Sequence, residues 1–96
     1  MPKKPTKTVA VHLRLYVAGQ APNSLLAIAN AKAICEDHYA LGYELEIVDL
    51  MDNPEAAFLD GIVVTPTLVR LMPAPARKII GTLSDREQVL LALGAV

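Results

Sequence analysis

The chain has few of the residues on which redox, metal-binding and membrane proteins depend. Its 96 residues include one cysteine, so no internal disulfide can form and a reducing cytoplasm is the expected compartment. No apolar run is long enough to span a bilayer, and the start lacks the apolar core of a secretory signal. A formal net charge of −1 gives no long-range field. We therefore expect neither a nucleic-acid nor a membrane partner.

The composition fits one small domain. Apolar residues make up 53% of the chain and charged residues 20%, which is enough for a single core of modest size. Residues 1–7 carry Lys3, Lys4 and Lys7 among prolines, a pattern typical of a disordered tail. We therefore predict a disordered tail over 1–7 and one domain over 8–96.

Hydrophobic periodicity predicts a strand, a helix and a second strand in the first half. Apolar residues alternate from Val9 to Val17, and again over residues 44–50. Between them a helix is expected from Ser24 to Leu41, with a capping oxygen from the Pro22-Asn23-Ser24 segment and a left-handed cap at Gly42. Two such strands joined by a helix form a parallel pair with a right-handed crossover.

The helix has one clearly apolar face and a second face that is only weakly polar. The face expected on the sheet carries Leu25, Ile28, Ala31, Cys35 and Tyr39. The opposite side carries Leu26, Ala29, Asn30, Ala33 and Asp37. This side is a candidate contact surface. The alternative is an ordinary helix surface, since single exposed leucines are common.

The second half predicts a short helix, two strands and a last helix. Pro54 favours the start of the short helix, and strands are expected over residues 67–71 and 77–80. Ser84 and Glu87 have the spacing of a capping box before a helix with an apolar stripe, whose members are Val89, Leu90 and Leu93. The element order is therefore β-α-β-α-β-β-α.

No set of residues combines a nucleophile, a base and an orienting group. Cys35 lies mid-helix on the apolar face, where a buried and inert thiol is expected. His12 and His38 lack neighbours at metal-ligand spacing. Asp49 and Asp52 could border a ligand crevice, although ending the strand and starting the turn is their simpler role. We expect no enzyme activity, no metal and no cofactor.

Two segments resemble the thioredoxin fold. The strand ending at Val17 runs into the Gly19–Ser24 turn and a helix, as in a thioredoxin, but this turn contains no cysteine. Thr65-Pro66 precedes a strand as the cis-proline element of that fold does, and we expect its peptide bond to be cis. The resemblance implies a thioredoxin-like α/β scaffold without thioredoxin chemistry.

Several motifs in fixed order resemble the KaiB family of circadian clock proteins, from about Thr8 to Leu93. They are Leu15-Tyr16-Val17-Ala18-Gly19, Pro22-Asn23-Ser24, Val48-Asp49-Leu50, Asn53-Pro54, Thr65-Pro66-Thr67-Leu68, Arg77-Lys78-Ile79-Ile80-Gly81 and Leu83-Ser84-Asp85-Arg86-Glu87. The resemblance implies a non-enzymatic protein that binds a KaiC-type hexameric ATPase and autokinase and modulates its phosphorylation cycle. In cyanobacteria it also implies capture of KaiA or of clock histidine kinases.

The chain departs from the family at positions that bear on its partners. Family members commonly carry basic residues at positions 26, 29 and 46, and acidic residues or lysine at positions 58, 59 and 61. We therefore expect altered partner electrostatics, both toward KaiA and toward a standard KaiC surface. The candidate partner-binding residues are Leu26, Ala29, Ala33, Glu46, Phe58 and Leu59.

The KaiB family also implies two folds, a thioredoxin-like binding form and a resting form, usually tetrameric, that rearranges the second half. Ala92 stands where the family has glycine, and alanine stabilises a helix interior by about 1 kcal/mol relative to glycine. We expect a monomer largely in the thioredoxin-like form, with the homotetramer as the alternative. The candidate determinants are Thr65, Pro66, Gly81, Ser84, Glu87 and Ala92.

Two other functions fit the same fold. One is the thioredoxin-like sensor domain of a histidine kinase, which also resembles KaiB. The other is a redox or glutathione-dependent enzyme, for which Ser24 is the only hydroxyl in the first turn.

Overall fold

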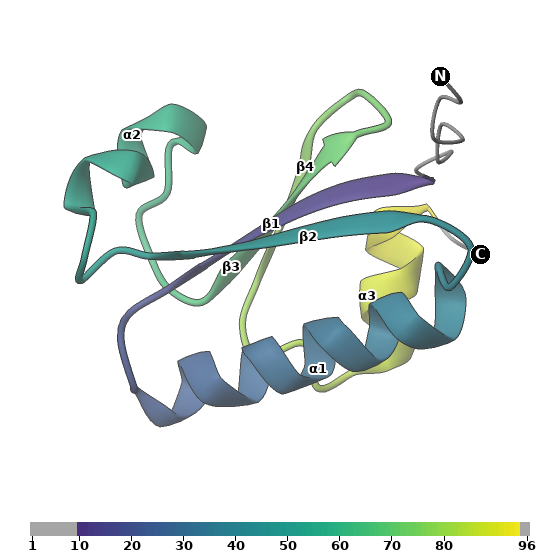
Figure 1. Ribbon diagram of the computed structural model, residues 1–96, viewed down its shortest axis with the longest axis horizontal. Coiled ribbons are helices and arrows are strands. Elements are labelled where there is room, and N and C mark those ends of the chain that lie inside the picture. Colours follow the sequence, from purple (N-terminus) through teal and green to yellow (C-terminus); the bar gives the residue numbers. More distant parts are fainter. Residues whose placement is uncertain (1–9, 95–96) are drawn as a thin grey trace, which may run out of the picture.

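A four-stranded sheet forms the centre of the computed structural model, which describes residues 10–94 (Figure 1). Its strands are β1 (Val11–Val17), β2 (Tyr43–Asp49), β3 (Thr67–Met72) and β4 (Arg77–Ile80), in the order β2-β1-β3-β4. β1 pairs parallel with β2 and antiparallel with β3, and β3 pairs antiparallel with β4. The predicted element order and the thioredoxin-like arrangement are confirmed.

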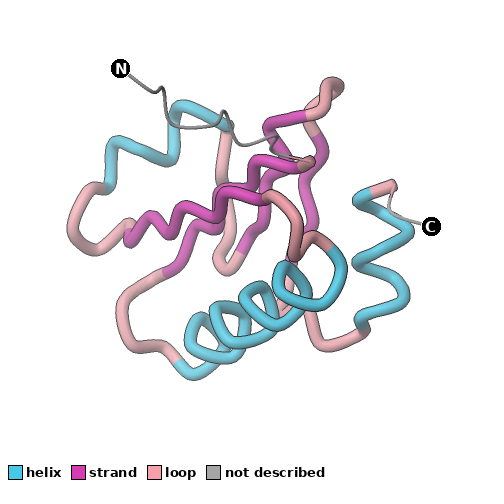
Figure 2. Tube along the Cα trace, turned by 45° about the vertical axis from the view of Figure 1, so that its right-hand side comes forward, coloured by secondary structure: helices cyan, strands magenta, loops and turns pink. Residues whose placement is uncertain are grey.

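The helices cover the two faces of the sheet unequally. α1 (Pro22–His38) and α3 (Arg86–Leu93) lie on one face, and the 3₁₀ turn η1 (Pro54–Ala56) and α2 (Ala57–Asp60) lie at one end of the other (Figures 1 and 2). α1 and α3 therefore cover most of one face of the sheet, whereas much of the second face stays open.

β1 supplies buried side chains to both faces of the sheet. The main core contains the predicted stripe of α3 and the buried side of α1; its members include Val11, Leu13, Leu15, Val17, Ala27, Ala31, Ile34, Leu68, Val89, Leu90 and Leu93. On the other face Tyr16 packs with Ala56 and Val69 in a smaller cluster. Alternation along β1 thus serves two cores of different size.

The predicted boundaries and inner face of α1 were partly wrong. The helix ends at His38, because Tyr39 takes φ −129° and the next turn closes from the Gly42 N–H to the Tyr39 carbonyl. Leu25 is 46% exposed, whereas Ala27 and Ile34 are buried. Ala31 and Cys35 are buried as predicted, and Ile28 and Tyr39 pack against the core, so Leu25 is the one expected member that lies outside it.

Both predicted N-terminal caps were wrong. Ser24 is buried inside α1, where its hydroxyl accepts a hydrogen bond from the Ala18 N–H at 3.0 Å and ties the helix to the end of β1. Asp85, not Ser84, caps α3 by accepting from the Gln88 N–H at 3.3 Å. Ser84 instead hydrogen-bonds the Thr82 hydroxyl at 2.8 Å. Glu87 lies in the first turn of α3, where a negative charge is still favourable.

Other local predictions hold. β4 has the expected bounds, and the Thr65-Pro66 peptide bond is cis. Asp49 has the structural role foreseen for it: its Oδ1 accepts from the N–H groups of Gly19 and Met51, each at 2.9 Å. The predicted tail over 1–7 and the start of the first strand at Val9 lie outside the described residues.

Cys35 is fully buried in the main core. Burial, with a smaller contribution from the negative charge of Glu36, raises the pKa of its thiol to about 11. The thiol therefore carries little thiolate at neutral pH, as the sequence led us to expect of an inert cysteine.

We predict that Asp49→Ala lowers the free energy of unfolding by about 1–3 kcal/mol, because two backbone donors lose their acceptor. Asp49→Asn keeps one acceptor oxygen and loses less. Asp52→Ala, at an exposed position of the same turn, is the matched control. Urea unfolding followed by circular dichroism measures the three values, and equal stability of the Asp49→Ala and Asp52→Ala variants would contradict this role.

The thiol pKa predicts slow labelling of Cys35 in the folded protein. At pH 8 a pKa of about 11 leaves roughly one thiol in a thousand ionised, and burial restricts reagent access further. Reaction with a disulfide reagent is expected to be at least about 100-fold slower in buffer than in denaturant. Because the pKa is raised, the native rate increases as the pH approaches 11. Equal rates in both solvents would disprove the assignment.

Candidate partner-binding surface

Exposed apolar side chains gather in the segment between β2 and β3. Met51, Phe58, Leu59 and Val63 are 71%, 85%, 74% and 88% exposed, and we call them the apolar rim. They belong to the segment that follows β2, at the end of the sheet where β1 and β2 terminate (Figure 1). Open α/β sheets commonly bind ligands at the carboxyl ends of their strands. Large side chains so exposed on one short segment are typical of a contact site.

A small hollow lies beside the apolar rim. Its volume is about 150 Å³, and it is lined by Leu50, Ile62, Val63, Val64 and Thr65. Pro66 follows it and is buried. The Pro66 carbonyl accepts from the Gly81 N–H at 3.0 Å. This hydrogen bond joins two of the candidate determinants of the fold, Pro66 and Gly81.

The candidate residues of α1 differ in exposure, and two of their neighbours form hydrogen bonds within the chain. Leu26 is 46% exposed and Ala29 is exposed, whereas Ala33 is half-buried. Two neighbours on the same side bind within the chain: Asn30 donates to the Thr82 carbonyl at 2.9 Å, and Asp37 accepts from Arg86 at 2.6 Å. Part of the weakly polar face of α1 is therefore used to fix the segment leading into α3.

The start of α1 and the apolar rim lie at the same end of the molecule but on opposite faces of the sheet (Figures 1 and 2). The structure therefore brings Phe58 and Leu59 together on α2 and places Leu26 and Ala29 separately on α1. Glu46 lies on the edge strand β2, apart from both groups.

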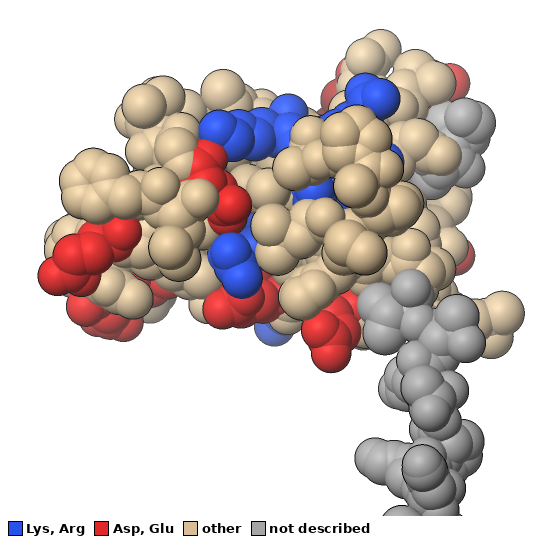
Figure 3. Space-filling model, turned by 90° about the horizontal axis from the view of Figure 1, so that it is seen from above, with Lys and Arg blue, Asp and Glu red and all other residues tan. Residues whose placement is uncertain are grey.

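The open face of the sheet carries charges of both signs. Figure 3 looks onto this side and shows blue and red side chains next to one another, without a large area of one sign. His12 lies 3.4 Å from Glu44, and Arg14 donates through Nε to Glu46 at 2.8 Å. The opposite charges of Arg14 and Glu46 on adjacent strands therefore neutralise each other locally.

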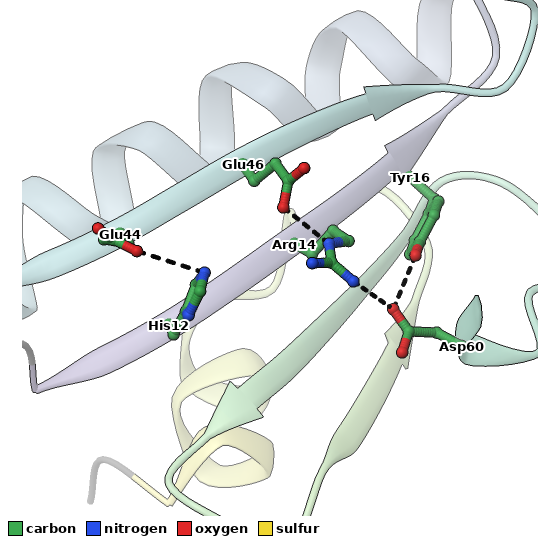
Figure 4. Close-up of polar contacts among 6 residues, drawn as sticks. All are labelled: His12, Arg14, Tyr16, Glu44, Glu46 and Asp60. Carbon is green, nitrogen blue, oxygen red and sulfur yellow. Dashed lines mark hydrogen bonds and ion pairs between the residues drawn. The ribbon is translucent and has the colours of Figure 1, made fainter. Parts of the chain in front are cut away.

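Arg14 also reaches across to α2. Its Nη1 donates to Asp60 Oδ2 at 3.2 Å, and the Tyr16 hydroxyl donates to the same oxygen at 2.7 Å (Figure 4). The hydrogen bond to Glu46 is the main cause that raises the pKa of Arg14, so the guanidinium stays charged. Burial, reinforced by the hydrogen bond to Asp60, raises the pKa of Tyr16, so the phenol stays protonated and donates.

A second hollow lies between β4 and α3. This groove has a volume of about 470 Å³ and is lined largely by apolar residues, among them Ile79, Ile80, Leu83, Val89 and Ala92. Ala92, the candidate helix-stabilising residue, is half-buried at its wall.

The described residues offer no catalytic constellation. Within residues 10–94, no group of three or more His, Cys, Asp or Glu side chains is placed to hold a metal ion. Ser24, the hydroxyl in the thioredoxin-like turn, is buried and already accepts a backbone hydrogen bond. No helix of this part of the chain has the length and apolar character needed to cross a membrane.

Sequence reasoning identified Phe58 and Leu59 but missed Met51 and Val63. Met51 directly follows the strand expected over residues 44–50, and Val63 lies ahead of the strand expected over residues 67–71. Their exposure could have been expected from the sequence, because an apolar residue outside the paired part of a strand has no neighbouring strand to cover it. Asp60 was also missed, since only the fold brings it to Arg14 and Tyr16.

Known structures resemble this fold at low sequence identity. The N-terminal domain of SasA from Synechococcus elongatus superimposes with a TM-score of 0.72 at 22% identity, covering 100% of this chain and 94% of that one. Mitochondrial thioredoxin 3 from Saccharomyces cerevisiae gives 0.72 at 13% identity, covering 94% and 82%. These likenesses establish the thioredoxin-like fold.

Sequence comparison identifies the family. The KaiB domain profile matches residues 14–95. The circadian clock oscillator protein KaiB of Rippkaea orientalis is 51% identical over 81 residues, which cover 84% of this chain and 78% of that protein. The circadian clock oscillator protein KaiB1 of a Synechocystis strain is 49% identical over 81 residues, covering 84% and 77%. These relatives support a clock function for this chain, which belongs to the KaiB family.

Proposed function

We propose that this chain is a non-enzymatic clock protein that binds a KaiC-type hexameric ATPase and autokinase and modulates its phosphorylation cycle in the cytoplasm. The apolar rim is the observation that carries the proposal, because it leaves four large side chains exposed at one end of the sheet of a thioredoxin-like fold. Membership of the KaiB family supports the choice of partner.

The binding surface in this proposal combines two groups of residues. Phe58 and Leu59 supply the apolar anchors from α2, since exposed aromatic residues are frequent hot spots in interfaces. Leu26 and Ala29 supply a second, separate contact area at the start of α1, at the same end of the molecule (Figure 1), and the half-buried Ala33 lies on the same helix. Glu46 is a separate candidate on the edge strand β2. KaiA or a clock histidine kinase is a second proposed partner of the chain.

The alternative of a histidine-kinase sensor domain stays a prediction. The SasA domain shares the fold at 22% identity, and a fold at that identity does not specify a function. The enzyme alternative loses its candidate residue, because the Ser24 hydroxyl is buried and hydrogen-bonded.

We predict that Phe58→Ala combined with Leu59→Ala weakens binding to the KaiC-type ATPase of the same organism at least about tenfold. Both side chains are exposed, so the free energy of unfolding is expected to change little. Leu41→Ala is the matched control, since Leu41 is 96% exposed at the opposite end of β2. Titration calorimetry gives the three affinities. Equal affinities would reject the surface, and no binding by the unaltered chain would reject the partner.

We further propose that the second half of the chain can rearrange, with the thioredoxin-like monomer as the dominant form. Two folds of one sequence can differ by only a few kcal/mol, so single residues shift the balance. Ala92 lies inside α3, and Gly81 takes φ 118° where β4 ends. Thr65, Pro66, Ser84 and Glu87 complete the proposed set of determinants.

We predict that Ala92→Gly lowers the ratio of the thioredoxin-like form to any competing form about fivefold, the equivalent of about 1 kcal/mol of helix propensity. Backbone NMR shifts of residues 86–93 report the fraction that is helical. Leu91→Ala, at an exposed position of the same helix, is the control and should keep α3 intact. Unchanged helical shifts and unchanged stability after Ala92→Gly would contradict the prediction.

A further inference from the structure

We propose that Tyr16 and Arg14 are positioning residues for the apolar rim: through Asp60 they hold α2 against the open face of the sheet and so present Phe58 and Leu59 to the partner. The inference rests on the proposed function for its partner and on the geometry of residues 14, 16 and 60 for its mechanism. We call these three residues the α2 latch.

α2 has little apolar packing of its own. It is four residues long, and none of its side chains is buried. Apolar anchoring comes from its flanks, where Ala56 is buried beside Tyr16 and the half-buried Ile62 joins the same cluster. A helix this short does not persist without tertiary contacts, so its orientation must be set by whatever its ends contact.

Asp60, the last residue of α2, makes those contacts. Its Oδ2 accepts from the Tyr16 hydroxyl at 2.7 Å and from Arg14 Nη1 at 3.2 Å, and its side chain is 17% exposed. Charge-assisted hydrogen bonds at a partly shielded site are stronger than neutral ones and demand a defined geometry. Both donors come from β1, an interior strand, so α2 is attached to a strand that is paired on both sides.

The other contacts at this end of α2 are weaker or internal. Lys78 donates to the Gly61 carbonyl at 3.4 Å in an exposed position, a long hydrogen bond. The Ile62 N–H donates to the Ala57 carbonyl at 2.8 Å, which closes the end of α2 but does not attach it to the sheet. The α2 latch is therefore the principal polar attachment among the described residues.

Glu46 orients the latch from the opposite side. It accepts from Arg14 Nε at 2.8 Å, and this bond leaves Nη1 directed toward Asp60 (Figure 4). Arg14 thus spans from the β2 edge to α2. Holding the apolar rim in place before the partner arrives lowers the ordering cost of binding, so the latch raises affinity without touching the partner.

Amide exchange in the free protein tests the latch without any partner. In Asp60→Ala the Ile62 N–H, bonded to Ala57 inside the α2 segment, is expected to exchange at least about tenfold faster. Asp60→Asn retains an acceptor oxygen and should recover part of the protection. Glu44→Gln removes a carboxylate on the same sheet face that pairs with His12 and not with α2, so its exchange rate should stay within twofold. Equal exchange in Asp60→Ala and Glu44→Gln would overturn the proposal.

Affinity for the KaiC-type ATPase then tests the positioning role. Tyr16→Phe keeps the buried ring and loses only the hydroxyl, so it serves if Asp60→Ala fails to fold. Either variant is expected to weaken binding three- to tenfold, mainly through faster dissociation, and the double variant should lose less than the product of the two. Faster exchange with unchanged affinity would overturn the positioning role. A wild-type chain that does not bind would reject the proposed function, while the exchange data would still decide the latch.

Discussion

Main-chain hydrogen bonds run from β1 to a strand on each side, and its side chains are buried on both faces of the sheet. Leu13 and Leu15 point into the core under α1 and α3, and Tyr16 points into the smaller cluster under α2. An interior strand that is paired on both sides and buries side chains on both faces tolerates little change. The positions of both helical layers therefore depend on the residues of this one strand.

The two layers are held with unequal strength. α1 and α3 share a continuous apolar core and are joined at the surface by Asp37 and Arg86. The α2 segment packs over a much smaller apolar cluster and depends more on polar contacts from Arg14 and Tyr16. Segments with few buried apolar contacts open at a lower free energy than the core does. The apolar rim thus sits on a part of the molecule that can be adjusted without disturbing the main core.

The sequence predicted the elements better than their contacts. β4 and the inner stripe of α3 followed from local pattern, because Val89, Leu90 and Leu93 recur at helical spacing after the polar run over residues 84–88. The inner face of α1 followed only in part, because alanines and leucines lie on several sides of that helix. Ala31 and Cys35 are buried as predicted, but Leu25 is exposed. The cap predictions were wrong for a related reason. Ser24 and Ser84 form hydrogen bonds with Ala18 and Thr82, and the spacing of residues within a helix does not predict these partners.

The candidate surface shows the same limit. Phe58 and Leu59 were identifiable as apolar residues at positions where the KaiB family commonly has charge. The hydrogen bonds from Arg14 and Tyr16 of β1 to Asp60 could not be predicted from the sequence. These residues are far apart along the chain, and only the folded arrangement of the sheet brings them together. Hydrogen–deuterium exchange of this chain with and without the KaiC-type ATPase of its organism tests the account most directly. Protection concentrated over residues 51–64 and the start of α1 is the predicted result, and protection confined to α3 and β4, with none over α2, would contradict it.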